Sequence, residues 1–387
     1  MKILAVDHNA VGRYDRGLYI ALDGFPDLHL TLLVPRRWQE SYGEVVTFEK
    51  GQAPLRILSG RVVFSGRSHR VMYRSLGTVI RTEKPDVLYV NAEPESFLAA
   101  QALFLRNHLA PEAHVGIASW RNLDSRRTGY PYKLGALHER IEHAVRASVD
   151  DCVAHTETIR TTLSAAGFTR STVIPPCVDT SLFAPSQKGA APNDDARSRV
   201  VGFVGRFVPL KGIDILLRAT VRVDPHPRIL LIGDGPERSR LLSLAGELNI
   251  SGLIEWSGPV SHHILPSYLR RMDALVLPSR SGGRWKEQFG RVVIEAMACG
   301  VPVVGSSSGE IPRVIGDAGL TFAEGDEAGL GIQLTKLLTD DHLREALIER
   351  GLKLVRETYA IEVVAPQYLA LFRRHSGRPR GDGSALR

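Results

Sequence analysis

The stretch Trp285-Lys-Glu-Gln-Phe-Gly-Arg-Val-Val-Ile-Glu-Ala-Met-Ala-Cys-Gly-Val-Pro-Val-Val-Gly305 predicts a helix followed by a strand. Its apolar run is typical of a buried helix, and Gly300 is suited to cap the end of that helix. The following strand is predicted at residues 302–304, and another is predicted before the helix at residues 274–277. Strand–helix–strand units build parallel sheets covered by helices, so the stretch predicts an α/β fold.

The same alternation of β-rich runs and helical segments continues along the whole chain. We therefore expect two doubly wound, Rossmann-like domains that face each other across a cleft, with ligands at the carboxyl ends of the strands. The predicted strands are residues 3–6, 30–34, 45–48, 87–90, 115–119, 152–155 and 173–174 in the first half and 200–204, 229–232, 253–256, 274–277 and 302–304 in the second.

A polar segment with two prolines, residues 185–199, is predicted to link the two domains. The first domain then spans residues 1–184 and the second spans residues 200–362. A C-terminal helix at residues 363–375 could pack back on the first domain. The Gly- and Pro-rich tail at residues 376–387 is expected to be disordered.

Composition narrows the class of protein. No apolar run reaches the roughly 18 residues that a membrane span needs, and the apolar start is too short for a signal peptide. The three cysteines, Cys152, Cys177 and Cys299, are typical of free thiols in a reducing cytosol, so a cytoplasmic protein is expected. The net charge of +7 favours an anionic partner, which could be a nucleotide, a phospholipid surface or nucleic acid.

A predicted strand ends at Gly205-Arg206, and Lys211-Gly212 follows five residues later. Glycine lets the backbone approach a ligand, while the arginine fork and the lysine ammonium together suit a diphosphate. A surface turn with two solvated cations would explain the same residues. A second glycine turn, around Gly233, resembles a dinucleotide fingerprint without its third glycine, and a plain strand-to-helix turn explains it as well.

Two glutamates flank the start of the helix in the opening stretch. Free backbone N–H groups near Gly290 and Arg291 would attract an anion. Glu287 lies in the preceding loop, and Glu295 lies within the first two turns, where its carboxylate can accept two neighbouring hydroxyls, as on a ribose. Alternatively, Glu287 is a charge favoured by the helix dipole and Glu295 is solvated, although apolar neighbours leave Glu295 little polar face.

These motifs, in this order and spacing, resemble the family 4 glycosyltransferases of the GT-B fold. The motifs are Gly205-Arg206 with Lys211-Gly212, Glu287-Gln-Phe-Gly290 through Glu295-Ala-Met-Ala-Cys-Gly-Val-Pro-Val303, and Gly309-Glu310-Ile-Pro312. The resemblance covers residues 200–330 and extends more thinly to 173–183. It implies that Arg206 and Lys211 bind the donor diphosphate and Glu295 binds the ribose. Glu287 and the backbone of Phe289 and Gly290 would hold the sugar.

The first half departs from the family pattern. Many members carry a glycine pair in the first loop, whereas this chain has only Gly12, which stays a predicted donor contact. Many also place a donor-contacting histidine where Trp120 or Arg121 stands here. In this family the first domain mainly forms the acceptor-binding site, so the resemblance defines the acceptor-binding residues less well than the donor-binding residues. His8, directly after the first strand, is a further candidate for a contact in the cleft.

Six arginines lie between residues 51 and 82 without any acidic residue. One helical face is predicted to carry four of these arginines, Arg67, Arg70, Arg74 and Arg81. This face could contact the inner face of an anionic membrane or a phosphorylated acceptor. A solvated helix face is the commoner explanation. No aromatic pattern or recognition module accompanies these arginines, which excludes nucleic acid as the expected partner.

No Asp-x-Asp sequence occurs in the chain, and the histidines form no metal motif. We therefore expect no metal and no cofactor, with a nucleoside-diphosphate sugar as co-substrate. The resemblance implies the activity of a retaining hexosyltransferase acting on a hydroxyl of a glycan, glycolipid or small metabolite. The catalytic residues would be Glu287, Arg206 and Lys211. The alternatives are a non-catalytic sugar-nucleotide-binding subunit and a nucleotide-sugar epimerase or oxidoreductase.

Overall fold

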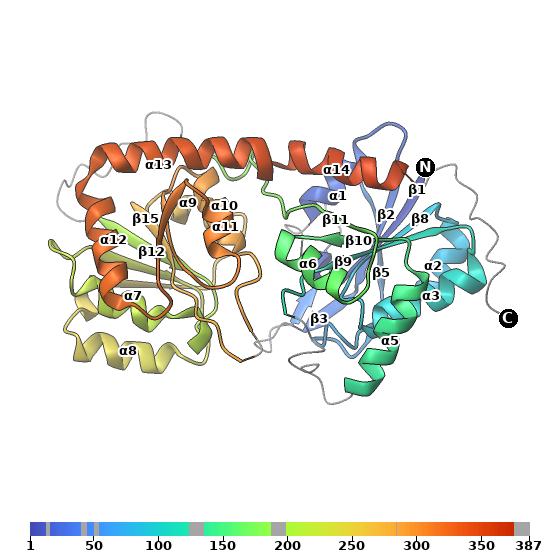
Figure 1. The fold of residues 1–387 in the computed structure, drawn as a ribbon, viewed down its shortest axis with the longest axis horizontal. Coiled ribbons are helices and arrows are strands. Elements are labelled where there is room, and N and C mark those ends of the chain that lie inside the picture. The colour runs from blue at the N-terminus through green and yellow to red at the C-terminus, as the bar shows by residue number, and fades with distance from the viewer. Residues whose placement is uncertain are drawn as a thin grey trace. The chain divides into compact units, whose positions relative to one another are not determined.

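The computed structural model describes residues 1–12, 16–39, 45–49, 54–123, 135–186, 199–283 and 285–374. Backbone contacts divide the chain into two compact units (Figure 1). The first unit combines Met1–Pro175 with Ile361–Arg387, and the second is Pro176–Ala360. The second unit thus begins before the predicted linker at 185–199, most of which lies outside the described residues, as does the predicted tail at 376–387.

The first unit contains a parallel sheet of seven strands in the order β11-β10-β9-β8-β1-β2-β5. Strand β1 is buried from its second residue onward because it lies inside this sheet. The strands are β1 (Lys2–Asp7), β2 (His29–Pro35), β5 (Arg56–Gly60), β8 (Val87–Asn91), β9 (His114–Ser119), β10 (Asp151–Ala154) and β11 (Ser171–Val173).

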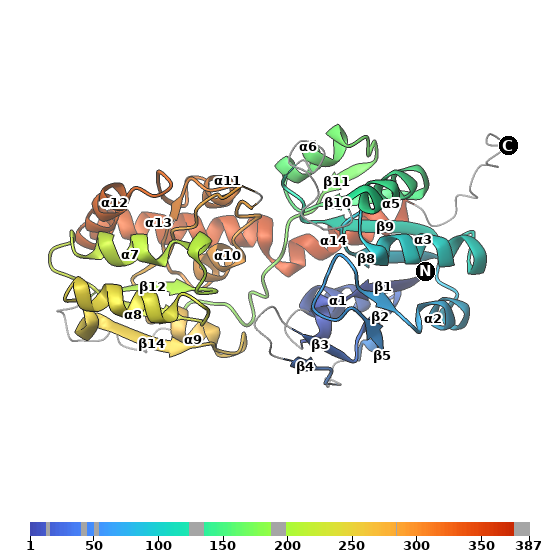
Figure 2. The same ribbon diagram turned by 90° about the horizontal axis from the view of Figure 1, so that it is seen from below.

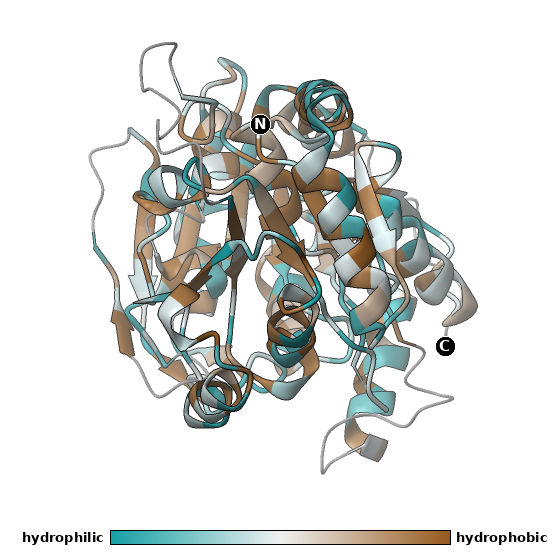
Figure 3. Ribbon diagram, turned by 90° about the vertical axis from the view of Figure 1, so that its left-hand side faces the viewer, coloured by the Kyte–Doolittle hydropathy of each residue, from teal (hydrophilic) through white to brown (hydrophobic). Residues whose placement is uncertain are grey.

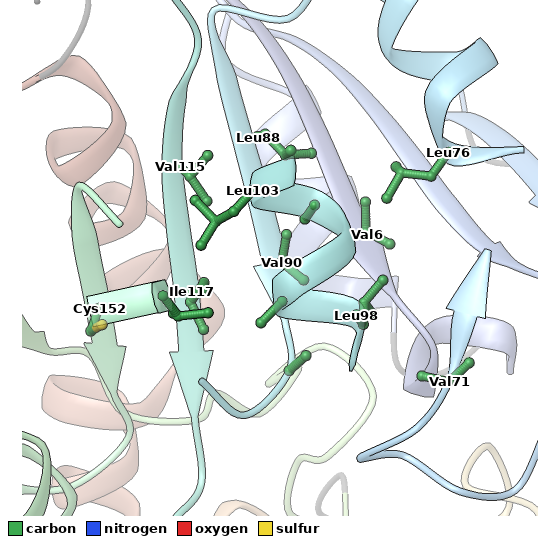
Figure 4. Close-up of a cluster of buried hydrophobic side chains, with 14 of the residues drawn as sticks. Val6, Val71, Leu76, Leu88, Val90, Leu98, Leu103, Val115, Ile117 and Cys152 are labelled. Carbon is green, nitrogen blue, oxygen red and sulfur yellow. The ribbon is translucent and has the colours of Figure 1, made fainter. Parts of the chain in front are cut away.

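Helices cover both faces of this sheet. Side chains on one face, including Val6, Leu88 and Ile117, form a buried core with Leu103 and neighbouring helical residues (Figure 4). Alternation along β8 turns Tyr89 to the other face, where its ring packs edge-on against Phe372 at a centroid distance of 5.6 Å. The helices are α1 (Gly17–Asp23), α2 (Leu76–Glu83), α3 (Phe97–Leu109), α5 (Gly135–Ser148), α6 (Glu157–Ala165) and α14 (Ile361–Arg373).

Helix α14 is the C-terminal helix, and it belongs to the first unit (Figure 2). It packs against α1, and Tyr368 contributes a hydroxyl that contacts the hydroxyl of Tyr89 at 3.3 Å. The chain therefore leaves the first unit after Pro175 and returns to it at Ile361.

The second unit has a parallel sheet of six strands in the order β14-β13-β12-β15-β16-β17, whose apolar strands are brown in Figure 3. The strands are β12 (Val200–Val204), β13 (Arg228–Ile232), β14 (Ile254–Gly258), β15 (Ala274–Leu277), β16 (Val303–Ser306) and β17 (Gly319–Phe322). Its helices are α7 (Ile213–Thr220), α8 (Arg238–Glu247), α9 (Leu265–Leu269), α10 (Arg291–Ala298), α11 (Ile311–Ile315), α12 (Glu327–Thr339) and α13 (Asp341–Leu354).

Both sheets are doubly wound, as the sequence predicts. Strand order reverses between β1 and β8 in the first unit and between β12 and β15 in the second. Two edge strands, β5 and β17, are not predicted, because edge strands are only partly buried and their hydrophobic pattern is weak. The predicted strand at 45–48 forms, but as β4 (Val45–Thr47), which pairs antiparallel with β3 (Arg37–Gln39) outside the main sheet.

The predicted arginine-bearing helical face is wrong. Residues Val62–Val63 (β6) and Met72–Tyr73 (β7) form a small antiparallel sheet, and α2 begins only at Leu76. Of the four arginines assigned to that face, only Arg81 lies in a helix. The β-branched residues of β6 and the aromatic ring in β7 favour strand pairing over continuation of the helix.

Candidate functional site

The motifs of the second half meet at the point where its strand order reverses. Strand β12 ends at Val204 and is followed by Gly205 and Arg206, while β15 ends at Leu277 and leads into the loop that carries Glu287. These two strands are neighbours in the sheet although they are separated in sequence by β13 and β14. Such a reversal is the usual ligand site of a doubly wound sheet, because the loops diverge there and leave a crevice.

Lys211 and Glu287 form an ion pair at this edge. Lys211 Nζ donates to Glu287 Oε2 at 2.6 Å, and the two side chains are 19% and 9% exposed. Ser279 Oγ donates to the same carboxylate oxygen at 2.8 Å. The ammonium group also lies 5.3 Å from the ring centroid of Trp285. The sequence predicts Lys211 and Glu287 as separate contacts of one donor, and the structure brings them into direct contact.

Close backbone approaches explain the glycines of these motifs. A Cβ atom on Gly212 would lie 2.0 Å from the carbonyl oxygen of Pro278, and one on Gly233 would lie 1.9 Å from that of Gly205. A Cβ atom on Gly309 would lie 2.1 Å from the carbonyl oxygen of Glu287. Any side chain at these positions would separate the loops that carry Arg206, Lys211 and Glu287, so the glycines hold the site together.

Helix α10 begins at Arg291, next to Gly290, whose φ of 81° is in the left-handed region that glycine favours. The first N–H groups of this helix are the predicted anion contacts, and Arg291 itself is exposed. The Phe289 side chain is buried and packs edge-on against Tyr359 at 5.7 Å. Only the backbone atoms of Phe289 are therefore available to contact a ligand.

Glu295 is buried, with 7% of its surface exposed, so the alternative of a solvated helix-face residue is wrong. His262 Nε2 lies 3.1 Å from Glu295 Oε1, and the His262 ring packs near Phe183 at a centroid distance of 4.8 Å. The sequence gives no signal for this pairing, because the two residues are far apart in the chain and His262 precedes a short helix. Arg206 is exposed beside the strand end.

Gly12 and His8 belong to the first unit. Gly12 follows a short 3-10 turn at Asn9–Val11 with an ordinary φ of −72°. His8 is buried with its ring 4.8 Å from the centroid of Trp38, and burial lowers the pKa of His8 despite the opposing charge of Asp7. His8 is therefore neutral near pH 7, which suits a hydrogen-bond contact better than a charge contact.

Arg121 lies in a buried ion network after the strand ends of β8 and β9. It donates to Glu142 at 2.7 and 3.2 Å and to Glu95 at 3.2 Å. Burial is the main cause that raises the pKa of Glu95, to about 7. The sequence missed Glu95 and Glu142, which lie in different segments. The guanidinium of Arg121 is therefore engaged by carboxylates of the first unit. The ring centroid of Trp120 lies 4.0 Å from that of His155.

Three further expectations concern sites of other kinds. All three cysteines are free. Across the residues that the structure describes, no group of three or more His, Cys, Asp or Glu side chains is arranged to hold a metal ion. None of the helices in the described ranges has both the length and the apolar character needed to cross a membrane.

Comparison with known sequences finds a family match within the second unit. Residues 187–354 match the family model described as glycosyl transferases group 1. The chain is 35% identical over 228 residues to a D-inositol 3-phosphate glycosyltransferase of Stackebrandtia nassauensis, which covers 53% of this chain and 50% of the relative. It is 36% identical over 236 residues to the protein of the same name from Mycobacterium bovis BCG, covering 56% and 46%. The chain spans about half the length of these relatives.

Comparison with solved structures extends over both units. Sucrose-phosphate synthase from Thermosynechococcus elongatus matches with a TM-score of 0.74 at 19% identity, covering 97% of this chain and 98% of that protein. Anabaena HepE in complex with UDP also matches with a TM-score of 0.74, at 17% identity, covering 97% and 100%. Residues 187–354 thus match the glycosyl transferases group 1 model, and the fold of the two units is similar to these solved structures, with the two Rossmann-like units of the GT-B fold.

Proposed function

We propose that this chain is a retaining glycosyltransferase of family 4, which transfers a sugar from a nucleoside-diphosphate sugar to a hydroxyl acceptor. The observation that supports this most is the pairing of Lys211 with Glu287 at the strand-order reversal of the second unit, beside the start of α10. A cation, a carboxylate and a helix N-terminus there match the needs of a diphosphate joined to a sugar. HepE is a structural neighbour with bound UDP, so UDP-sugars are the first donors to test.

The donor would bind with its diphosphate at Arg206, Lys211 and the backbone N–H groups near Gly290. Glu295 would accept hydroxyls of the ribose, and Glu287 would hold the sugar near its reacting carbon. Since Glu287 already accepts a hydrogen bond from Lys211, the lysine would contact both the diphosphate and the glutamate that holds the sugar. The buried position of both carboxylates strengthens these interactions, because little water competes for them.

The reaction breaks the bond between the anomeric carbon and the phosphate oxygen, and the electron pair stays on the diphosphate. The acceptor oxygen bonds to the same carbon from the same face, and its proton passes to the departing diphosphate oxygen. Arg206, Lys211 and the helix N–H groups would stabilise the charge that develops on the diphosphate. Because protein cations would supply that charge, we propose that no divalent metal is required.

The experiment is a panel of nucleotide sugars with candidate acceptors, in which released nucleotide and glycosylated product are measured together. Turnover with at least one UDP-sugar is expected, and NMR of the first-formed product should show the donor's anomeric configuration. An inverted anomeric centre would contradict the retaining mechanism. Donor binding without turnover across the acceptor panel would favour the non-catalytic binding subunit instead.

A further inference from the structure

A pocket of about 500 Å³ lies at the amino-terminal edge of the sheet in the first unit. Its lining comes from the last turns of α3 and α5 and from the residues directly before β10 and β11. Parallel strands begin at this edge, whereas the ligands of doubly wound sheets bind where the strands end. The pocket is therefore distinct from the strand ends of this unit that carry Asn91 and Ser119.

Three arginines line this pocket: Arg106 on α3, Arg146 on α5, and Arg170 before β11. Asp150 is the single acidic residue among the lining residues, which leaves a formal charge of +2 from three arginines and one aspartate. Asp150 Oδ2 accepts from the backbone N–H of Val115 at 2.8 Å, so part of its charge is already engaged. A pocket with this balance suits a dianion.

Arg106 is the most buried of the three, with 1% of its surface exposed. Its Nη2 donates to the carbonyl oxygen of Ser148 at 2.8 Å. Its Nε and Nη1 are buried and have no hydrogen-bond partner among the described residues. Leaving such donors buried without an acceptor costs about 1–3 kcal/mol each, so an acceptor that Arg106 reached by turning its guanidinium toward the pocket would lower this cost.

Helix capping explains only part of this arrangement. Arg106 bonds the carbonyl of Ser148, the last residue of α5, and Arg146 Nη1 donates at 2.7 Å to the carbonyl of Ala166, which follows α6. Cations are favourable at helix C-termini, so these two bonds stabilise the fold. A guanidinium carries five N–H donors, however, and one carbonyl leaves most of those on Arg106 unused. The carbonyl oxygens of Ser148 and Ala166 would repel an anion in the pocket. Because each accepts a hydrogen bond from an arginine, this repulsion is reduced.

We propose that this pocket binds a phosphate dianion, either as soluble phosphate or as the phosphate monoester of a lipid headgroup. A phosphate offers several acceptor oxygens, and arginine forks match their geometry. Arg106 would hold the phosphate from within the pocket, with Arg146 and Arg170 at its more exposed side. This site is independent of the proposed donor site, which lies in the second unit.

The test is calorimetric titration of the full chain with inorganic phosphate in a phosphate-free buffer. A Lys211→Ala background reduces phosphate binding at the proposed donor site. Saturable binding is expected, and Arg170→Gln should weaken it at least about tenfold. The matched control is Arg140→Gln, which removes the same charge from the exposed surface of α5 without touching the pocket lining. Circular dichroism should show that each variant is folded.

Vesicles distinguish the two sources of phosphate. If phosphatidic acid in phosphatidylcholine vesicles sediments the protein, and Arg170→Gln but not Arg140→Gln prevents this, the ligand is a lipid headgroup. If the protein binds phosphate but stays in the supernatant, the ligand is a soluble phosphate. Absence of saturable phosphate binding, or equal binding by Arg170→Gln and Arg140→Gln, would overturn the proposal.

Discussion

Lys211 Nζ lies 2.6 Å from Glu287 Oε2, although the two residues come from different loops of the second unit. The carboxylate also accepts from Ser279, so Glu287 is oriented from two directions before any ligand is considered. A donor diphosphate at Lys211 would therefore have to share the ammonium group with Glu287. The lysine has three N–H donors, which permits this sharing.

Loss of Lys211 should impair donor use strongly. Lys211→Ala removes a cation from the departing diphosphate and removes the ion-pair partner of the buried Glu287 carboxylate. We expect kcat/KM for the donor to fall by a factor that corresponds to a loss of roughly 2–4 kcal/mol in transition-state stabilisation. Steady-state kinetics with varied donor would measure the change. Lys336→Ala on the exposed surface of α12 is the control, and wild-type turnover in Lys211→Ala protein would exclude the proposed role.

The two glutamates should affect different kinetic constants. Glu287→Gln keeps the shape of the side chain but removes charge near the reacting carbon, so kcat should fall strongly. Glu295→Gln should mainly raise the donor KM, because a ribose contact is made equally in the ground state and the transition state. Determining both constants for both variants checks this division. The same kcat and KM changes in the two variants would show that they do not act on separate parts of the donor.

Activity should not depend on a divalent metal. Arg206, Lys211 and the α10 N-terminus would supply the positive charge that a metal provides in other transferases. Treatment with EDTA should therefore leave the initial rate within about twofold of the untreated rate. If EDTA abolishes activity and magnesium or manganese restores it, the diphosphate is not held as proposed.

The buried Glu95 should make stability depend on pH. Its folded pKa is raised by burial to about 7 from 4.5, so the folded chain keeps a proton that the unfolded chain loses as pH rises. This contribution is fully present below pH 4.5 and is lost as pH rises through 7. Its size is on the order of 3 kcal/mol.

Glu95→Gln removes this titration, since a glutamine stays neutral at every pH. Urea unfolding at pH 5 and pH 8 should show a smaller loss of stability for the variant than for the wild type. Glu139→Gln, an exposed residue on α5, is the control and should keep the wild-type pH dependence. An unchanged pH dependence in Glu95→Gln protein would show that Glu95 is ionised in the folded chain throughout this range.

Local sequence determined much of the second unit. The apolar run after Gly290 predicted α10, because a buried helix needs apolar residues on most of its surface. Glycines at strand ends predicted the turns at Gly205 and Gly233, because few other residues permit such close backbone approach. The same local reasoning failed for residues 67–74, where arginine spacing suggested a helix and cross-strand pairing decided otherwise.

Only the tertiary structure decided which side chains meet. Lys211 contacts Glu287, and His262 contacts Glu295, because strand order places loops side by side that are distant in the chain. The sequence suggested that a C-terminal helix could pack back on the first domain, and the structure shows the contact that does so, between the aromatic residues of α14 and Tyr89. A sequence pattern shows how apolar each segment is and at what spacing its apolar residues recur. These two properties determine local structure. It does not record the order of strands in a sheet, and that order brings the candidate site together.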